Sequence, residues 1–425
     1  MFKKSALLLS LATSLMVTGC GVMPAGLFGG GAGDMNAQGT KGSKAGASDW
    51  TVFVYIAGDN NLSPFAAKDL NEMEAGLTSE RVKVVALVDQ DREGDSRIVE
   101  IKNDPKGVNS TLVSPVIDDG GAVIPKASKE VDTGSSATLE KFINWGTKNY
   151  PSKRSMLVMW NHGGGAFASP NHLKSFCWDD QSGNNLNLVD LWRATQKVSS
   201  KAKFDVIGFD TCLLGHAETA YQLRDVADFL VSSEKVEPGD GWDYQSLTSA
   251  LSKTPGMYPR EFSSKIVETY SAWYKKANQE STLSSIDLQK LKDRVVPGVN
   301  ALATDLQAGL STPAFKAALA GVVNKAANLS ATGSGEEDAI DLGLFCNLIQ
   351  ESSLPATTKA LAKEVNTQLT RSVVLSMTNR LPGGAFTGLK IYFGLETYNA
   401  AYSDGSHQIF GTTQWAKFLQ SYLKK

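Results

Sequence analysis

Short apolar segments that alternate with helical segments constrain the fold of this chain more than any other feature. These segments are rich in β-branched and aromatic residues, a composition typical of strands. They are Thr51–Ala57, Val82–Val88, Ser155–Trp160, Phe204–Phe209 and the shorter Phe229–Ser232. Because the run Val82–Val88 carries almost no polar residue, we expect it to be buried on both faces, as strands of a parallel sheet are.

Segments with helical periodicity separate these strands. We expect helices over Leu62–Leu77 and Ser135–Tyr150, the second ended by Pro151, and a further helix over Leu213–Arg224. Asn61 or Ser63 is a candidate cap for the first of them. Strands that alternate with helices favour an α/β fold with a mostly parallel central sheet covered on both faces.

Other segments fit the edges of this sheet or extend beyond it. Arg97–Ile101 is expected to form an edge strand, and residues 103–134 to form loops or a short hairpin. After residue 290 we expect helices near 288–308, 313–329, 338–350 and 355–371, with strands at Ser372–Met377 and Leu389–Phe393. The sequence thus predicts a core domain at 50–290 and a C-terminal helical subdomain at 291–425 that returns to the sheet.

The first twenty residues have the pattern of an export signal. Lys3 and Lys4 precede a short apolar run, Ala6–Met16, which is too short to span a bilayer. The run ends at a lipobox-like Val-Thr-Gly-Cys whose thiol, on Cys20, would be acylated. We therefore expect a lipoprotein signal peptide at 1–20, a tether rich in Gly, Ala and Ser at 21–49, and a chain anchored to the bacterial cell envelope, at the outer membrane or cell surface. An ordinary signal peptide with a chance cysteine is the alternative.

Charge and cysteine content narrow the function. A formal net charge of −2 and the lack of a long Lys/Arg run argue against a nucleic-acid partner, which requires a basic face. Lipidation of Cys20 would leave three cysteines, Cys177, Cys212 and Cys346, in an exported chain. An odd number leaves at least one free thiol, which is either a nucleophile or a buried apolar side chain.

Two reactive residues directly follow predicted strands. His162 comes after Ser155–Trp160 and precedes three glycines, and Cys212 comes shortly after Phe204–Phe209. If these strands are parallel neighbours, both residues lie at the carboxyl edge of the sheet, where an imidazole can activate a thiol. The glycines allow backbone N–H groups to approach an oxyanion. A helix that begins at Cys212 would further stabilise its thiolate.

Each motif also has a structural interpretation when taken alone. His-Gly-Gly-Gly fits a tight turn, and a cysteine at a strand end is most often a packing residue. The remaining histidines are weaker candidates. His216 would share the helix face of Cys212 and we expect it to pack locally, whereas His172 and His407 pair with no other feature.

Metal binding has little support in the sequence. No group of His, Cys and Asp has the spacing of a zinc site. Asp179 and Asp180, beside Asn184, are candidate calcium ligands, but a solvated acidic loop is the better interpretation because calcium requires more oxygen ligands. We therefore expect no cofactor, with calcium as the open alternative.

Four segments in this order carry a resemblance to a known family. They are WTVFVYIAGDNNLSPFAAKDLNEME, MLVMWNHGGGAF, FDVIGFDTCLLGHAETAYQL and SSEKVEPGDGWDY. Together they resemble the clostripain family of cysteine peptidases, in the clan of caspases, legumains and gingipains, over most of residues 50–290. DAIDLGLF and GLKIYFG are similar to the family's C-terminal region. The resemblance implies a caspase-like fold, a dyad of Cys212 and His162, and oxyanion-hole donors near Gly163 and Cys212.

The resemblance also implies an endopeptidase that cuts protein or peptide substrates after Arg or Lys. Acidic side chains would read that basic residue. Asp210, two residues before Cys212, shares its face if the backbone is extended, although it could instead cap the next helix. Asp240, on a glycine-rich loop, and Asp59, after the first strand, are weaker candidates.

Self-processing is a further expectation from relatives of this type. The segment between Gly165 and Phe204 is long and starts with a polar, Pro-containing stretch, in which Lys174 is the only basic residue of the loop. An enzyme specific for Lys or Arg would cut there, and an uncut open loop is the alternative.

Other functions remain open at this point. The chain could be a catalytically idle member that serves as a surface binding lipoprotein, a structural lipoprotein of the envelope, or an acyltransferase or esterase that uses its cysteine. We expect a monomer.

Overall fold

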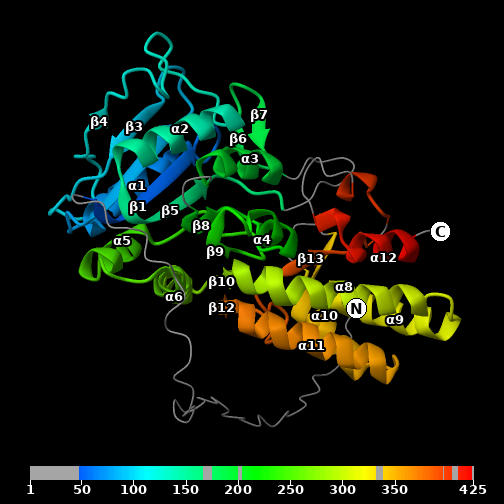
Figure 1. Ribbon diagram of the computed structural model, residues 1–425. Helices are drawn as coiled ribbons and strands as arrows, with labels where there is room; N and C mark the ends of the chain where they lie inside the picture. Colours follow the sequence, from blue (N-terminus) through cyan, green and yellow to red (C-terminus); the bar gives the residue numbers. More distant parts are fainter. Residues whose placement is uncertain are drawn as a thin grey trace, which may run out of the picture. The chain divides into compact units, whose positions relative to one another are not determined.

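A nine-stranded sheet forms the centre of the part of the chain that the computed structural model describes, residues 47–165, 175–199, 203–331, 338–395, 397–403 and 410–423 (Figure 1). Its order is β12-β10-β9-β8-β5-β1-β2-β3-β4. Five central strands run parallel: β1 (Ser48–Ala57), β2 (Val82–Asp89), β5 (Ser152–Trp160), β8 (Phe204–Asp210) and β9 (Ala227–Ser232). The outer strands are antiparallel: β3 (Arg97–Glu100), β4 (Val116–Ile117), β10 (Ser281–Asp287) and β12 (Val373–Asn379).

The predicted strands and the mostly parallel sheet are confirmed. Each run of β-branched and aromatic residues lies in a central strand, and β8 is buried along its whole length. Buried strands lose contact with water on both faces, so nearly continuous apolar sequence is what stabilises them.

Helices cover the two faces of the sheet. On one face, Val52 and Val54 of β1 share a core with α1 (Ser63–Gly76), α5 (Tyr244–Lys253) and α6 (Pro259–Ala277). On the other, Phe53 and Tyr55 share a core with α2 (Ser136–Asn149), α3 (Leu188–Ser199) and α4 (Ala217–Leu223). The alternation follows from the two-residue period of a strand, and it gives three layers.

The C-terminal helices extend the second of these cores. They are α7 (Leu288–Lys290), a π-helical turn (Leu291–Val295), α8 (Val296–Gly309), α9 (Pro313–Leu329), α10 (Leu342–Glu351), α11 (Ala356–Ser372) and α12 (Gln414–Tyr422). Short 3₁₀ turns lie at Ala400–Tyr402 and Phe410–Thr412. Buried side chains of these helices, such as Leu302 and Phe418, belong to the same hydrophobic cluster as Phe53.

Two small sheets accompany the main one. β6 (Phe176–Asp179) pairs with β7 (Asn184–Leu186), and β11 (Ala339–Asp341) pairs with β13 (Lys390–Tyr392). The predicted strand Leu389–Phe393 therefore joins β11 and not the central sheet, whereas the predicted strand Ser372–Met377 does reach the central sheet as β12. The predicted helix near 338–350 begins only after strand β11.

Strand β10 was missed by the sequence analysis because its sequence, STLSSID, is rich in serine. Its serines are nevertheless buried, and hydrogen bonds satisfy them. The hydroxyl of Ser284 donates to the carbonyl of Gly388 at 2.7 Å, and that of Ser285 donates to Ser263 Oγ at 2.7 Å. Contacts with distant residues thus decide that this polar segment is a strand of the core.

Within the described ranges, none of the helices combines the length and apolar character that crossing a membrane would require.

Candidate active site

The pairing of β5 with β8 brings the two motifs together. The strands are parallel neighbours, and their last paired residues are Trp160 and Asp210. His162 and Cys212 each follow two residues later, so both lie just beyond the same edge of the sheet. The predicted adjacency of the two strands is therefore confirmed, and it places a histidine and a cysteine at equivalent positions on neighbouring strands.

The loop after β8 does not form the expected helix. Helix α4 begins only at Ala217, and Leu213 adopts a left-handed conformation with φ of 64°. Backbone contacts hold this loop: Leu213 N–H donates to the carbonyl of Lys235, and Gly215 N–H donates to that of Ser233. The prediction of a helix beginning at Cys212 was wrong, so no helix dipole acts on its thiol. A left-handed non-glycine residue is strained and persists only where the surroundings enforce it.

The backbone of Gly163 packs directly on the nucleophile loop. A Cβ atom at this position would lie 2.0 Å from the carbonyl oxygen of Cys212, so only glycine fits. The Cys212 thiol is partly exposed and accepts a hydrogen bond from the Glu237 N–H at 3.3 Å. Burial raises the pKa of this thiol, while the N–H groups of Glu237 and Gly163 act in the opposite direction. Backbone donors thus already surround the sulfur.

The other described cysteines have a different environment. Cys177 and Cys346 are buried free thiols, and burial raises the pKa of both. A thiol that stays protonated is a poor nucleophile, which leaves Cys212 as the reactive candidate among the three.

His162 contacts a residue that follows β1. Its Nε2 atom lies 2.7 Å from Asn61 Oδ1. Burial lowers the pKa of His162, and the charge of Asp180 partly opposes this effect. A neutral imidazole with a proton on Nε2 donates to Asn61 and keeps Nδ1 free to accept a proton.

Two neighbouring asparagines fix the backbone around this pair. Both Asn60 and Asn161 donate from their side-chain amides to the carbonyls of Ala57 and Trp178. They therefore tie the end of β1 to the end of β5. Neither Asn61 nor Ser63 caps α1 as predicted, because Leu62 occupies the cap position without a side-chain bond.

Asp210 lies at the end of β8, beneath the loop of Cys212. It is buried and accepts hydrogen bonds from the Tyr244 hydroxyl at 2.8 Å and the Trp242 N–H at 3.4 Å. Burial raises its pKa to about 6, although these hydrogen bonds favour the ionised form. A Cβ on Gly241 would lie 3.0 Å from both of its oxygens, so a glycine keeps this side of the carboxylate open.

The other two acidic candidates have different partners. Asp240 is about half exposed and forms an ion pair with Lys68 at 2.8 Å. Asp59 follows β1, which is two strands, or about 10 Å, away from β8 in the sheet. Of the three residues, Asp210 is the one at the end of the strand that leads to Cys212.

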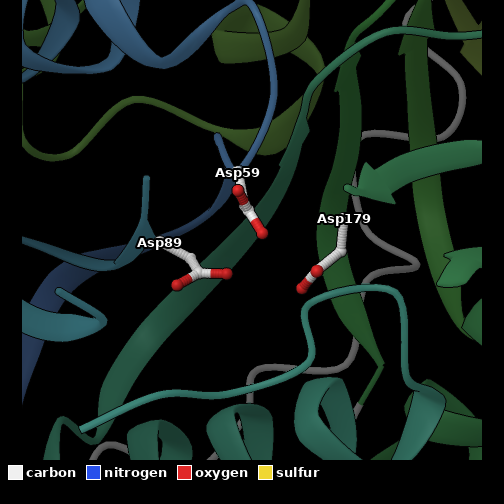
Figure 2. Close-up of side chains that lie close together, drawn as sticks. All are labelled: Asp59, Asp89 and Asp179. Atoms are coloured by element: carbon white, nitrogen blue, oxygen red, sulfur yellow. The ribbon is translucent and has the colours of Figure 1, made fainter. Parts of the chain in front are cut away.

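Asp59 belongs to a separate group of carboxylates. Its oxygens lie within 4.8 Å of those of Asp89 and Asp179, and Figure 2 shows the three side chains turned toward one another. All three accept hydrogen bonds from neighbouring N–H or O–H groups, for example Thr133 N–H to Asp179 at 2.8 Å. Such a group has the chemistry of a divalent-cation site, yet shared protons also stabilise it; burial raises the pKa of Asp89 to about 9. Asp180, grouped with Asp179 in the sequence analysis, is not part of this group of carboxylates.

The remaining sequence candidates are quickly placed. His216 is buried at the start of α4, with Nδ1 3.8 Å from Glu218 Oε2. It does not share a helix with Cys212 as predicted. His172, Lys174, His407 and Cys20 lie outside the described residues.

Two residues near the site escaped the sequence analysis. Asn61 was considered only as a helix cap, and Glu237 was passed over in favour of Asp240 on the same loop. The signal for Asn61 was its place directly after a strand that ends at the site edge. For Glu237, the signal was an acidic residue immediately before the Pro-Gly turn.

Comparisons with known proteins identify the family. The model of the Clostripain family matches residues 54–422. Clostripain of Hathewaya histolytica is 30% identical over 224 residues, which cover 46% of this chain and only 41% of clostripain.

Solved structures share the fold. A secreted C11 cysteine protease from Bacteroides thetaiotaomicron, bound to an irreversible peptide inhibitor, has a TM-score of 0.63 at 21% identity, over 86% of this chain and 99% of that one. An inactive zymogen C11 protease from Parabacteroides distasonis has a TM-score of 0.62 at 19% identity, over 88% and 98%. These likenesses confirm the expected fold class. Since the family model covers most of the sequence, the chain belongs to the clostripain family.

Proposed function

We propose that this protein is a cysteine endopeptidase with Cys212 as nucleophile and His162 as base. The observation that carries the proposal is the parallel register of β5 and β8, which places both residues at one edge of the sheet. The decisive experiment measures peptide hydrolysis by the Cys212→Ala variant, and we expect the activity to be lost.

The chemistry follows from the groups around the sulfur. His162, whose pKa is lowered by burial, accepts the thiol proton, and the thiolate attacks the scissile carbonyl. The N–H groups of Gly163 and Cys212 would stabilise the oxyanion of the tetrahedral intermediate. The protonated imidazole then gives its proton to the leaving amine, and water hydrolyses the resulting thioester. This chemistry requires no cofactor; a calcium ion in the group of Asp59, Asp89 and Asp179 would act on stability, away from the reacting atoms.

Specificity for Arg or Lys before the cut bond is the second part of the proposal. Asp210 is buried at the end of the strand that leads to Cys212, and its ionised form would pair with a basic side chain. A catalytically idle surface lipoprotein is the alternative, and labelling by a peptidyl electrophile separates the two functions.

We assign Asn61 the role of a positioning residue for His162. Asn61→Ala is expected to lower kcat/KM about 10-fold, because the imidazole loses the acceptor that holds its Nε2 proton. Asn61→Asp keeps an acceptor and adds a negative charge, which raises the pKa of His162. The base is then protonated up to a higher pH, so the acidic limb of the pH profile of kcat/KM should move to higher pH.

Asn61 is exposed, so neither substitution is expected to change the melting temperature. An Asn61→Ala enzyme with wild-type kcat/KM, or an Asn61→Asp enzyme with an unshifted acidic limb, would show that Asn61 has no such role.

Self-cleavage after Lys174 is also part of the proposal. Its support is that Ser175, the next residue, is buried and accepts a hydrogen bond from Gly164 N–H at 2.9 Å. Phe176 also pairs with Gly163, the residue after His162. The new N-terminus at Ser175 would therefore lie close to His162. The Parabacteroides distasonis protease of similar fold is an inactive zymogen, which supports proposing cleavage as an activation step here.

Export and lipid anchoring at Cys20 complete the proposal, with the protein acting as a monomer on protein or peptide substrates. Cys20→Ser is expected to move the protein from the detergent phase to the aqueous phase in a phase-separation assay, because it loses its acyl chains. kcat/KM should stay the same, since the tether separates the anchor from the site. A Cys20→Ser protein that still partitions with detergent would rule out lipidation at this residue.

A further inference from the structure

Several buried polar atoms without a hydrogen-bond partner gather around Asp210 and Cys212. In the described part of the chain they include both carboxylate oxygens of Glu237, the indole Nε1 of Trp242, the hydroxyls of Thr211 and Tyr270, and Oδ1 of Asp69. Their proximity is evident from their mutual electrostatic effects: Glu237 interacts with both Asp210 and Cys212, and Tyr270 interacts with Glu237.

A ligand that forms hydrogen bonds would be stabilised at such a concentration of buried polar atoms. Native proteins leave few buried polar atoms unsatisfied, because each has lost water without gaining a hydrogen bond. Two carboxyl groups, Glu237 and Asp69, contribute three of the atoms and are acceptors when ionised. A positively charged ligand that donates several hydrogen bonds would satisfy these carboxylate oxygens.

Glu237 is the carboxyl of this group that is tied most directly to the nucleophile. Its backbone N–H donates to Cys212 Sγ at 3.3 Å, and its residue is only 8% exposed. The side chain of Glu237 therefore begins at a backbone segment that contacts the Cys212 sulfur. The residue before a cut bond bears the carbonyl that the sulfur attacks, so its side chain must enter the protein close to this point.

The loop that carries Glu237 is held rigidly. The hydroxyl of Tyr274 donates to the carbonyls of Pro238 and Gly241, at 3.3 and 2.7 Å. The carboxyl of Glu237 lies beside Asp210 and Trp242, whose interactions with it shift its pKa in opposite directions: Asp210 raises it and Trp242 lowers it. The backbone of this loop thus holds the Glu237 carboxyl beside Asp210.

The pKa of Glu237 is also relevant to the binding of a positively charged side chain. Burial raises the pKa of Glu237 well above its usual value, and the neighbouring charge of Asp210 adds to this effect. A cationic side chain beside Glu237 would lower this pKa and favour the ionised carboxylate.

We propose that Glu237 is a specificity-determining residue which, together with Asp210, binds the basic side chain before the cut bond. The proposal rests on the peptidase function proposed above. It assigns this role to Glu237 rather than to Asp240, whose carboxylate already pairs with Lys68.

The test compares two peptide substrates that differ at one residue, arginine or its uncharged isostere citrulline before the cut bond. Glu237→Gln in the full chain is expected to lower the ratio of kcat/KM for arginine over citrulline roughly 10- to 100-fold, the effect of one charge-assisted hydrogen bond. Glu280→Gln is the matched control. It removes the same charge from an exposed acid that pairs with Lys235, two residues from Glu237, and should leave the ratio within about twofold.

Folding and positioning effects are separated by two further measurements. Glu237→Asp, which retains the charge, should restore part of the ratio, and the rate of Cys212 alkylation by iodoacetamide should stay near that of the wild type. An unchanged ratio in Glu237→Gln, or an equal loss on both substrates, overturns the inference while the peptidase function stands. A wild-type chain that cleaves neither substrate and is not alkylated at Cys212 overturns the proposed function, and the inference with it.

Discussion

Cys212→Ala is expected to abolish peptide hydrolysis, with kcat/KM falling on the order of 10⁴-fold or more. The methyl group cannot attack the scissile carbonyl, and no other described thiol can replace it, since Cys177 and Cys346 are buried. The measurement is hydrolysis of a fluorogenic peptide with arginine before the cut bond.

His162→Ala should reduce the same rate by about 10²- to 10⁴-fold, the usual contribution of a general base. Cys346→Ala is the matched control, because it removes a thiol from the core of α10 and should leave kcat/KM close to wild type. Thermal unfolding of each variant tests whether the fold is kept. A folded Cys212→Ala chain with full activity would contradict the proposed function.

The same variant tests self-cleavage. Wild-type protein should separate into two fragments, the second beginning at Ser175, whereas Cys212→Ala should remain a single chain on a denaturing gel. Lys174→Ala should also remain whole. Fully active wild-type protein that is still intact would exclude this loop as the activation site.

Asp210→Asn is expected to remove the preference for basic residues, with kcat/KM for arginine substrates falling about 100-fold. The amide that replaces the buried carboxylate carries no charge, so the basic side chain would be buried without an ionic partner, which is costly. The reference is the citrulline substrate, for which the loss should be much smaller. A side-chain library that shows preference for apolar or acidic residues in the wild type would refute the assignment.

The pH dependence gives an independent test of Asp210. Its pKa is raised to about 6, so the carboxylate is ionised above that pH and neutral below it. Arginine cleavage should therefore decline below about pH 6 more steeply than citrulline cleavage. In Asp210→Asn the two profiles should become parallel, because the titrating charge that distinguishes the substrates is gone.

The sequence alone was sufficient for the central strands and for the two motifs of the site. Val82–Val88 and Phe204–Phe209 are so apolar that burial on both faces is their most favourable state, whatever their partners. The positions of His162 and Cys212 just after such strands then follow from a general property of parallel sheets, whose carboxyl ends share one edge.

The tertiary structure decided what surrounds those two residues. The helix expected at Cys212 is replaced by a loop because Leu213 and Gly215 bond to the segment after β9, a contact that local helical periodicity does not encode. Strand β10 is buried although it is polar, because Gly388 and Ser263 supply partners for its serines.

The acidic candidates also show which properties the sequence predicts and which the tertiary structure decides. Asp59, Asp210 and Asp240 are all aspartates near a predicted strand end, and the sequence analysis favoured Asp210 over the other two. Their different roles arise from partners far along the chain: Asp89 and Asp179 for the first, Tyr244 for the second and Lys68 for the third. Strand formation depends on burying the residues of a single segment, and the apolar composition of that segment is visible in the sequence. The role of a carboxylate depends on which distant groups desolvate it or bond to it, and only the folded chain brings those groups together.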